Sequence, residues 1–296
     1  MTTQTRTTSR STAPVLVIGA TGRIGRAVVG ELRRAGVPVR ALSRQPATAQ
    51  SDAGVESAVG DLTVPESLDT ALRDVRVVFL VWTAGPGSMP EVVERFARSV
   101  ERVVFLSSPH RTPHPFFQQP NAMRTFHADI EHALASSGLA PTIVRPGMLS
   151  ANAVEWWADQ IRAGDAIRWP YGAAETAPID ERDIAAVAVR ALCDSAHAGQ
   201  DYVITGPAAI SHAGQVQVLG EVLGRRLRFD ELTPDEFRRD TASRWPAPVV
   251  EMLLSAWGAT LGHPAYVTST VAEVTGAPAH TFADWATANS DRFRSE

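Results

Sequence analysis

Short β-branched apolar runs alternate with helical patterns through the first 145 residues. Six such runs predict strands, at Val15–Ile18, Val37–Leu42, Val55–Val59, Arg76–Trp82, Arg102–Ser107 and Pro141–Arg145. Between the first two, apolar residues recur at helical spacing from Ile24 to Ala35, which predicts a helix closed by Gly36. Strands that alternate with helices in this way predict a Rossmann-like α/β fold, a doubly wound parallel sheet with helices on both faces.

The pattern changes beyond Pro146. Strand patterns weaken there, and six of the seven tryptophans lie at or after position 156. Helices are predicted at Asn152–Ala163, Asp183–Asp194, Ser211–Leu223 and Pro248–Gly258, with short strands at Tyr202–Thr205 and Leu227–Glu231. We therefore predict a disordered tail over residues 1–13, a Rossmann core over residues 14–150, and a smaller substrate-side lobe over residues 151–296 that is interleaved with the core.

Composition and charge narrow the classes of function. The chain of 296 residues has a net charge of −4, so it lacks the basic surplus that nucleic acid binding requires. Its apolar runs are far shorter than the roughly 20 residues of a membrane helix, and its first residues lack a secretory pattern. We expect a cytoplasmic protein that does not span a membrane. All 28 residues counted as Lys and Arg are arginine, which excludes mechanisms that need a lysine.

A glycine-rich loop follows the first predicted strand. It reads Gly19-Ala20-Thr21-Gly22-Arg23-Ile24-Gly25 and leads directly into a predicted helix. The first glycine allows a tight turn, the second lets the backbone approach a diphosphate, and the third packs the helix on the strand. The free N–H groups and the dipole of the helix start attract the anion. We therefore predict that residues 14–150 bind a dinucleotide through Gly19, Thr21, Gly22, Arg23, Ile24 and Gly25.

The end of the second predicted strand indicates which dinucleotide is bound. NAD sites usually place Asp or Glu there to hold the ribose hydroxyls, whereas this chain has Ser43 and Arg44. Arg44, helped by Ser43 and Arg23, can hold a 2′-phosphate through charge-assisted hydrogen bonds. The sequence favours NADP(H), and a solvated loop arginine is the alternative interpretation of Arg44.

Three further segments carry a family resemblance. They are Gly60-Asp61-Leu62, Phe105-Leu106-Ser107-Ser108 and Thr142-Ile143-Val144-Arg145-Pro146-Gly147. Together with the glycine loop they resemble the NmrA-like group of atypical short-chain dehydrogenases/reductases, over about residues 14–235. The resemblance implies an NAD(P)-binding fold in which Asp61 and Leu62 contact the adenine. It also implies that a loop with Trp82 and Thr83 passes the ribose and nicotinamide.

The chain departs from ordinary members of that superfamily at the catalytic helix. Asn121–Glu131 resembles the helix that carries Tyr-x-x-x-Lys, with Met123 in place of the tyrosine and His127 in place of the lysine. General acid catalysis contributes roughly 10² to 10⁴ in rate, so its loss disfavours reduction of unactivated ketones. An acceptor that is already electrophilic, such as a quinone, can still accept a hydride. The resemblance extends to NmrA-like quinone and azo-dye reductases and to relatives that sense the nucleotide without turnover.

His127, Ser108 and Glu131 are the candidate catalytic residues. His127 and Glu131 lie four residues apart on one helix face, so Glu131 can orient an imidazole that also contacts the nicotinamide ribose. Ser108 follows a central strand, at the edge where open α/β sheets bind ligands. The alternative for His127 and Glu131 is an ordinary pair on the helix surface, and the alternative for Ser108 is a structural turn at the strand end.

Apolar side chains predict a pocket for a flat hydrophobic ligand. The expected substrate contacts are Trp82, Phe117, Met148, Asn152 and Trp156. Each aromatic can instead belong to the core, and Asn152 can cap a helix. His110 and His114 do not predict a metal site, because prolines prevent a shared helix and no cysteine or carboxylate cluster completes four ligands. The lone cysteine, Cys193, is expected to be buried in a helix.

Three functions remain open at this point. The leading one is an NADPH-dependent reductase of an electron-poor aromatic or quinone-like small molecule, without the Tyr/Lys pair. The second is a regulatory protein that binds NADP(H) and changes the activity of a protein partner. The third is a non-redox isomerase or cyclase on the same fold. Formation of a homodimer also stays open.

Overall fold

The computed structural model describes residues 13–45, 54–120 and 122–294, and these divide into two compact units. The first unit comprises residues 1–106, 132–142 and 188–200, and the second comprises residues 107–131, 143–187 and 201–296. The chain passes between the units five times, so the two units are interleaved along the sequence. The tail predicted for residues 1–13 lies, apart from Ala13, outside the described residues.

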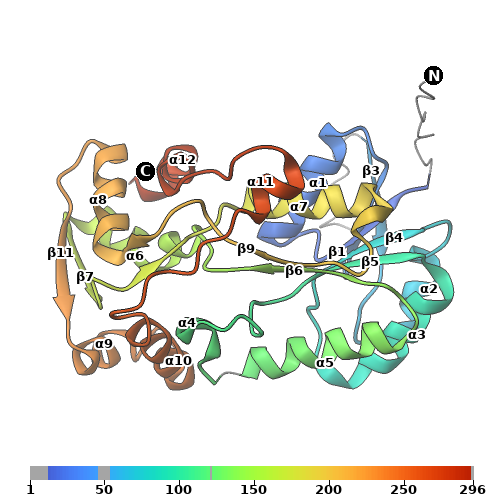
Figure 1. Ribbon diagram of the computed structural model, residues 1–296, viewed down its shortest axis with the longest axis horizontal. Helices are drawn as coiled ribbons and strands as arrows, with labels where there is room; N and C mark the ends of the chain where they lie inside the picture. Colours follow the sequence, from blue (N-terminus) through green and yellow to red (C-terminus); the bar gives the residue numbers. More distant parts are fainter. Residues whose placement is uncertain (1–12, 46–53, 121, 295–296) are drawn as a thin grey trace, which may run out of the picture. The chain divides into compact units, whose positions relative to one another are not determined.

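Parallel strands form the sheet of the first unit, in the order β3-β2-β1-β4-β5. The strands are β1 Val15–Ile18, β2 Val39–Ser43, β3 Val55–Val59, β4 Val77–Leu80 and β5 Arg102–Leu106. The helices are α1 Arg23–Arg34, α2 Leu68–Ala71 and α3 Met89–Ser99. Strand order reverses between β1 and β4, since the chain first builds outward through β2 and β3 (Figure 1). Open α/β sheets bind ligands at such a switch point.

Burial explains why the elements of the first unit form where they do. Every residue of β1 and β4 is buried, as expected for parallel strands that helices cover on both faces. On α1 the buried residues are Ile24, Gly25, Val28 and Leu32, which recur at helical spacing. The helical pattern therefore places one apolar stripe of α1 in the core and leaves its arginines outside.

The second unit contains most of the remaining elements. Its strands are β6 Thr142–Pro146, β7 Ala166–Pro170, β8 Glu175–Thr176, β9 Asp201–Ile204, β10 Ile210–Ser211 and β11 Arg228–Leu232. Its helices are α4 Pro115–Gln118, α6 Asn152–Ala163, α8 His212–Leu223, α9 Pro234–Thr241, α10 Ala247–Gly258, α11 Thr270–Thr275 and α12 Phe282–Ala288. The division cuts α5, Ala122–Ser136, and α7, Glu181–Cys193. The central sheet has seven strands in the order β3-β2-β1-β4-β5-β6-β9.

Aromatic side chains build the core of the second unit. Trp156 of α6 lies with its ring centroid 5.7 Å from that of Trp169 of β7 and 5.3 Å from that of Trp257 of α10. His212, at the start of α8, is fully buried against the edge of Trp257, with ring centroids 5.1 Å apart. The parallel pair β7 and β11 lies beside α9 and α10 (Figure 1). The tryptophans beyond position 155 therefore serve mainly to fill this core.

Most predicted elements are present, with ends that coincide or are shifted by one or two residues. Val15–Ile18, Val55–Val59 and Asn152–Ala163 coincide with β1, β3 and α6. The sequence analysis missed β7, β8, β10, α4, α9, α11 and α12. It was also wrong about Cys193, which is exposed because it is the last residue of α7 rather than part of its inward face.

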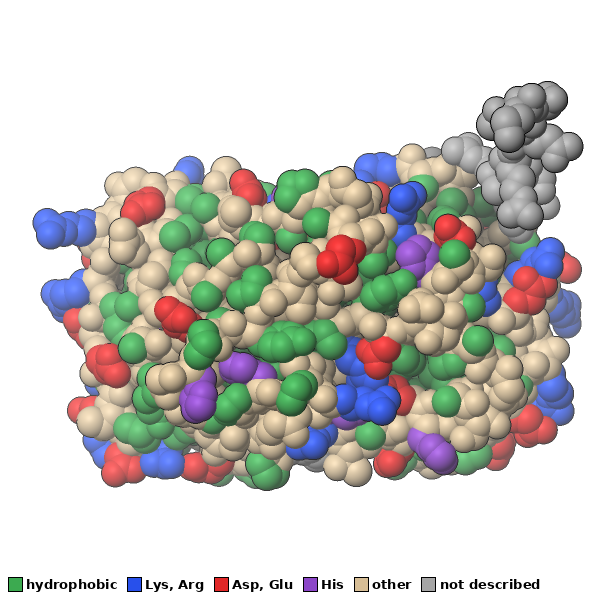
Figure 2. All heavy atoms as spheres, in the orientation of Figure 1, with side chains coloured by type: hydrophobic (Ala, Val, Ile, Leu, Met, Phe, Trp, Pro, Cys, Tyr) green, Lys and Arg blue, Asp and Glu red, His purple; other side chains and the backbone are tan. Residues whose placement is uncertain are grey.

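The surface of the described residues mixes both signs of charge. On the face seen in Figure 2, acidic and basic side chains lie among apolar and neutral ones. None of the helices in the described part of the chain combines the length and the apolar character needed to cross a membrane.

Candidate functional site

The glycine loop between β1 and α1 forms a backbone cradle. Gly19 has a positive φ of 81°, and the N–H of Gly22 closes a tight turn by donating to the carbonyl of Gly19 at 3.0 Å. Gly22 precedes α1 with an extended backbone and no side-chain cap, and the first turn of α1 contains no acidic residue. The first N–H groups of α1 are therefore left for an external acceptor.

The glycines at two positions of this loop pack too closely against their surroundings to carry side chains. A Cβ on Gly25 would lie 2.1 Å from the Gly19 carbonyl oxygen, and one on Gly19 would lie 2.8 Å from the Cβ of Val81. Val81 directly follows β4, so the loop packs at the point where strand order reverses. A loop of this shape at a helix N-terminus offers N–H donors and a positive dipole to an anion. Its residues would hold the pyrophosphate of a pyridine dinucleotide.

The end of β2 carries the residues proposed to distinguish NADP(H) from NAD(H). Ser43 is buried, and its Oγ donates to the carbonyl of Gln45 at 2.9 Å. Arg44 is exposed and lies close enough to help lower the pKa of Asp61, although the main cause of that shift is the hydrogen bond from the backbone of Thr63. Ser43 thus shapes the local turn, while Arg44 is the exposed cation at this strand end.

The residues that resemblance assigned to the adenine and ribose lie in two turns. Asp61 accepts hydrogen bonds from the N–H and the hydroxyl of Thr63, both at 2.8 Å, and Leu62 is buried. Trp82 follows β4, is buried, and donates from Nε1 to the carbonyl of Ala84 at 2.8 Å. These contacts hold the two turns, and the cofactor contacts of Asp61, Leu62, Trp82 and Thr83 stay predictions.

A buried charge cluster organises the second unit around Arg145 of β6. Arg145 is 1% exposed, and its guanidinium binds both oxygens of Glu131 at 2.5 and 2.8 Å and both oxygens of Asp201 at 2.6 and 2.8 Å. Burial acts to lower the pKa of Arg145, but these hydrogen bonds raise it overall. The same guanidinium donates to the carbonyl of Ser108 at 3.0 Å, and Ser107 donates to Glu131. Arg145 thus ties the start of the loop after β5 to α5 and β9.

His127 and Ser108 meet beside this cluster. The Nδ1 of His127 lies 2.8 Å from the Oγ of Ser108. Burial is the main cause that lowers the pKa of His127. The nearby His110 and Arg145 lower this pKa further, whereas the Glu131 carboxylate raises it. The sequence analysis gave Glu131 the role of orienting His127. In the structure Glu131 holds Arg145 and Ser107, and Ser108 is the hydrogen-bond partner of His127.

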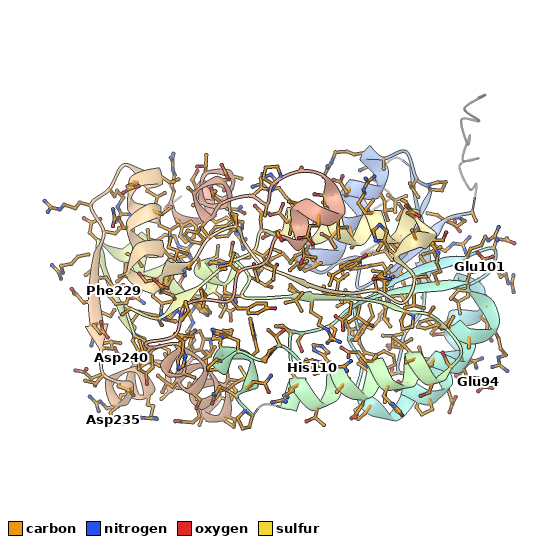
Figure 3. The ribbon with its side chains drawn as sticks, in the orientation of Figure 1. Glu94, Glu101, His110, Phe229, Asp235 and Asp240 are labelled. Atoms are coloured by element: carbon orange, nitrogen blue, oxygen red, sulfur yellow. The ribbon has the colours of Figure 1, made fainter. Side chains whose placement is uncertain are left out.

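His110 is a third imidazole in the cluster, which the sequence analysis considered only as a metal ligand. It is 7% exposed, with Nε2 3.6 Å from Glu131 and Nδ1 3.1 Å from the carbonyl of Ser108. The pKa of His110 is lowered, mainly by burial. The charge of Glu131 acts to raise this pKa, and the charge of Arg145 lowers it. Figure 3 shows His110 beside α5, the helix that carries His127 and Glu131.

An apolar cavity of about 200 Å³ opens next to Ser108 and His110. Its apolar wall comes mainly from α4, α10 and Met148, and its other polar lining residues are Gln119 and Arg124. Phe117 and Met148, both predicted as substrate contacts, lie together here. This cavity is therefore lined by a serine, a histidine and a hydrophobic surface.

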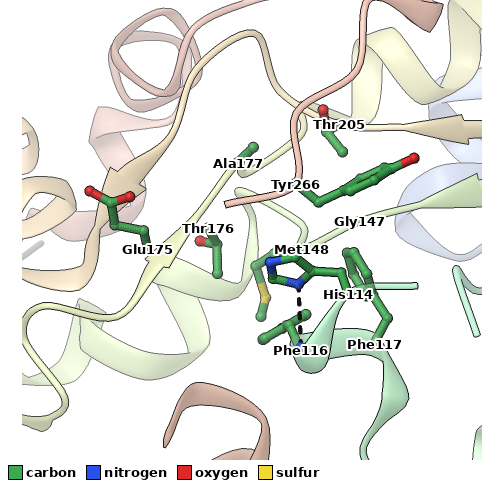
Figure 4. A pocket seen from close by; sticks show the side chains of 10 residues that line it. All are labelled: His114, Phe116, Phe117, Gly147, Met148, Glu175, Thr176, Ala177, Thr205 and Tyr266. Carbon is green, nitrogen blue, oxygen red and sulfur yellow. Dashed lines mark hydrogen bonds between the residues drawn. The ribbon is translucent and has the colours of Figure 1, made fainter. Parts of the chain in front are cut away.

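A second and much smaller cavity shares part of that wall. Figure 4 shows the rings of His114, Phe117 and Tyr266 grouped around it, with Phe117 and Tyr266 edge to face at 6.2 Å. His114 accepts from the N–H of Phe116 at 3.3 Å, which caps α4. Its Nε2 lies 3.0 Å from the carbonyl of Pro264, so both nitrogens serve the local fold.

Two other predicted substrate residues lie elsewhere in the second unit. Trp156 is 5% exposed and belongs to the tryptophan core. Asn152 is the first residue of α6, and its side-chain amide lies 3.0 Å from the sulfur of Met148. Asn152 therefore contacts Met148, which lines the cavity, without lining the cavity itself, and Trp156 is a core residue.

The sequence analysis missed Arg145 as the partner of Glu131, and Asp201 as the second partner of Arg145. Arg145 lies 14 residues from Glu131 and 56 residues from Asp201 in sequence. Arg145 and Asp201 belong to β6 and β9, which pair in parallel. An arginine inside the apolar strand Thr142–Pro146 is the one available indication, because a buried arginine must have acidic partners. Among the described residues, His, Cys, Asp and Glu side chains form no group of three suited to a metal ion.

Comparisons with known proteins agree with this architecture. A (4-alkanoyl-5-oxo-2,5-dihydrofuran-3-yl)methyl phosphate reductase of Streptomyces griseus is 38% identical over 289 residues, which cover 95% of this chain and 100% of that protein. An NAD(P)H azoreductase of Xenophilus azovorans is 33% identical over 287 residues, covering 94% and 99% of the two chains.

Solved structures share the fold at lower identity. The NADPH-dependent quinone oxidoreductase of Escherichia coli in complex with NADPH has a TM-score of 0.79 at 23% identity, covering 93% of this chain and 99% of that chain. The triphenylmethane reductase of Citrobacter sp. with NADP(H) has the same TM-score at 18% identity, covering 93% and 99%.

The family assignment rests on the nucleotide-binding part of the chain. A family model described as NAD(P)H-binding matches residues 19–195, which begin at the first glycine of the loop. The resemblance to the NmrA-like group of atypical short-chain dehydrogenases/reductases is confirmed by these matches, and so is the expected pyridine nucleotide cofactor. The chain belongs to the NAD(P)H-binding family.

Proposed function

We propose that the protein is an NADPH-dependent reductase of electron-poor acceptors, aromatic or quinone-like small molecules that accept a hydride without a strong general acid. The observation that carries the proposal is the 2.8 Å contact between the Nδ1 of His127 and the Oγ of Ser108. Ser108 is one of the residues that line the apolar cavity. The relatives named above reduce azo, quinone and oxo-dihydrofuran compounds, so activated acceptors are a common theme.

The proposed reaction divides the work between the nucleotide and the side chains. Bound NADPH supplies the hydride, which reduces the acceptor by two electrons. Ser108 donates its hydroxyl proton to the acceptor atom on which negative charge develops, and His127 returns a proton to Ser108 across the 2.8 Å contact. Arg145 positions Ser108 by binding its carbonyl, and Glu131 neutralises Arg145. The apolar wall excludes water from the acceptor.

Preference for NADPH over NADH follows from Arg44. Its guanidinium is exposed at the end of β2, where a carboxylate would be expected in a site for NAD. A 2′-phosphate placed there would receive charge-assisted hydrogen bonds from a planar donor group.

Turnover with a panel of acceptors tests the function. Oxidation of NADPH, followed at 340 nm with quinones, azo dyes and conjugated enones, is expected with the wild-type protein. His127→Ala should lower kcat/KM by about tenfold to a hundredfold, because Ser108 loses its proton source. His132→Ala is the matched control, since His132 is an exposed histidine on the same helix.

The pH profile adds a second readout. Because the pKa of His127 is lowered by burial, its protonated fraction rises only as the pH falls below about 6.5, so the proton-dependent step should quicken there. The acid rise should vanish in His127→Ala. Tight nucleotide binding without turnover of any acceptor would contradict the reductase and favour the sensor.

A further inference from the structure

Arg124 is the cation that lines the apolar cavity beside Ser108. Phenylalanine, methionine and leucine side chains line the same cavity, including Phe117, Met148 and Leu253. Arg124 itself is half-buried, in the first turn of α5. A guanidinium that borders an apolar space is less screened than one in open solvent, so it binds an anion more strongly there.

Hydrogen bonds hold Arg124 in relation to the loop that carries Ser108 and His110. Its Nη1 donates to the carbonyl of Gln118 at 3.1 Å. The side chain of Gln118 in turn donates to the carbonyl of Thr112 at 2.6 Å and to that of His110 at 3.2 Å. An arginine fixed in this way loses little conformational entropy when it binds a ligand, which favours a specific role in recognition.

The position of Arg124 on α5 relates it to the proposed proton donors. Arg124 precedes His127 by three residues, which corresponds to about 4.5 Å along the helix axis and places both side chains on one face. His127 contacts Ser108, and Ser108, His110 and Arg124 line the same cavity. A ligand in this cavity can therefore meet Ser108 with its reacting atoms and Arg124 with a substituent a few atoms away.

We propose that Arg124 is a specificity-determining residue that binds an anionic substituent of the acceptor, a carboxylate, sulfonate or phosphate. The inference rests on the proposed reductase function and names its substrate class, an electron-poor compound with an acidic group next to an apolar body. The flexible side chains of Met148 and Met252 allow that apolar body to vary.

A matched pair of acceptors tests this class by turnover. The neutral acceptor is 2-methyl-1,4-naphthoquinone, and the anionic one is 1,4-naphthoquinone-2-sulfonate. We expect Arg124→Gln to reduce the ratio of kcat/KM for the sulfonate to kcat/KM for the neutral quinone by about tenfold to a hundredfold. Arg124→Lys should reduce it less, because it keeps the charge but loses the planar donor group. Arg239→Gln removes an exposed arginine of α9 and should leave the ratio as in the wild type.

A binding measurement separates failure of the anion site from failure of the reductase. Quenching of tryptophan fluorescence by 2-naphthalenesulfonate gives its Kd without any turnover, and Arg124→Gln should raise that Kd by about tenfold or more. Equal ratios and equal Kd values in wild type and Arg124→Gln would overturn the inference. Absence of NADPH oxidation with both quinones, together with a raised Kd in the variant, would contradict the reductase but support the anion site.

Discussion

The glycine loop of the first unit and the buried charge cluster of the second unit are built on opposite principles. The loop uses backbone groups within seven consecutive residues, Gly19–Gly25, and depends on side chains being absent. The cluster uses side chains from three separated segments, which meet at Arg145 with Glu131 and Asp201. A site made of backbone groups can be predicted from consecutive residues, whereas a site made of paired charges forms only when folding brings distant residues together.

The comparison also separates two ways in which a substitution does harm. Adding atoms should damage the loop, since its glycines leave no room. Removing a charge should damage the cluster, because a buried ion left without its partner costs more than the pair contributed. The predictions that follow test this contrast, from the largest expected effect to the smallest.

Arg145→Met should destabilise the protein by about 3–5 kcal/mol, because Glu131 stays buried without its partner. Chemical denaturation gives the change in the free energy of unfolding. The control is Arg76→Met, which breaks an ion pair with Glu101 in which both side chains are more than half exposed. A loss of stability no greater than in the control would show that the cluster is not structural.

His212 makes the stability of the second unit depend on pH. Burial among tryptophans lowers its pKa to about 4, so the folded protein keeps it neutral while the unfolded chain protonates it near 6.5. The contribution to stability is complete above about pH 6.5 and is lost as the pH falls towards 4, by about 3 kcal/mol. Thermal melting of His212→Asn, which keeps a donor for the Pro170 carbonyl, should show a flatter pH dependence over this range. Parallel curves for variant and wild type would disprove the assignment.

Gly25→Ala should weaken NADPH binding by about a hundredfold, equivalent to about 2.8 kcal/mol, because the new Cβ would displace the Gly19 carbonyl. Titration with NADPH gives the Kd. Gly30→Ala on the same helix is the control, since no atom lies within 4 Å of its Cβ position. That variant should bind normally and gain about 0.5–1 kcal/mol of helix stability. Equal Kd values for the two variants would refute the backbone cradle.

Arg44→Ala should reduce the preference for NADPH over NADH by about tenfold, through loss of one charge-assisted contact. Dissociation constants for both nucleotides measure the change. Arg98→Ala removes an exposed arginine of α3 and serves as the control for net charge. A tighter constant for NADH than for NADPH in the wild type would reject the assignment at Arg44.

Local patterns predicted the nucleotide-binding half better than the rest. Strands β1 and β3 of that half were predicted to the residue, and β1 is an unbroken apolar run. In the second unit helix α6 was predicted to the residue, because it shows an apolar stripe of its own. Strand β7 was missed, although it contains Ile167 and Trp169, because the run is short and ends in Pro170. Its pairing with β11, about 60 residues later, supplies the hydrogen bonds that the local pattern does not reveal.

The candidate site shows the same division. Ser108, His127, Phe117 and Met148 were identified from position and type, and the structure brings them to or beside one cavity. Trp156 was placed in the wrong environment, since an aromatic pattern does not distinguish core from pocket. His110 and Arg124 were not recognised as cavity residues, because their neighbours come from α10 and from Met148, far away in the sequence.

The sequence by itself determined the parallel sheet, the glycine loop and the exclusion of lysine chemistry, since these depend on local residue order and composition. Only the tertiary structure decided that Glu131 holds Arg145 rather than His127, and that Ser108 takes His127 as its partner. The physical reason is that a buried charge needs an opposite charge beside it, and only folding places Glu131 of α5 and Asp201 of β9 next to Arg145 of β6.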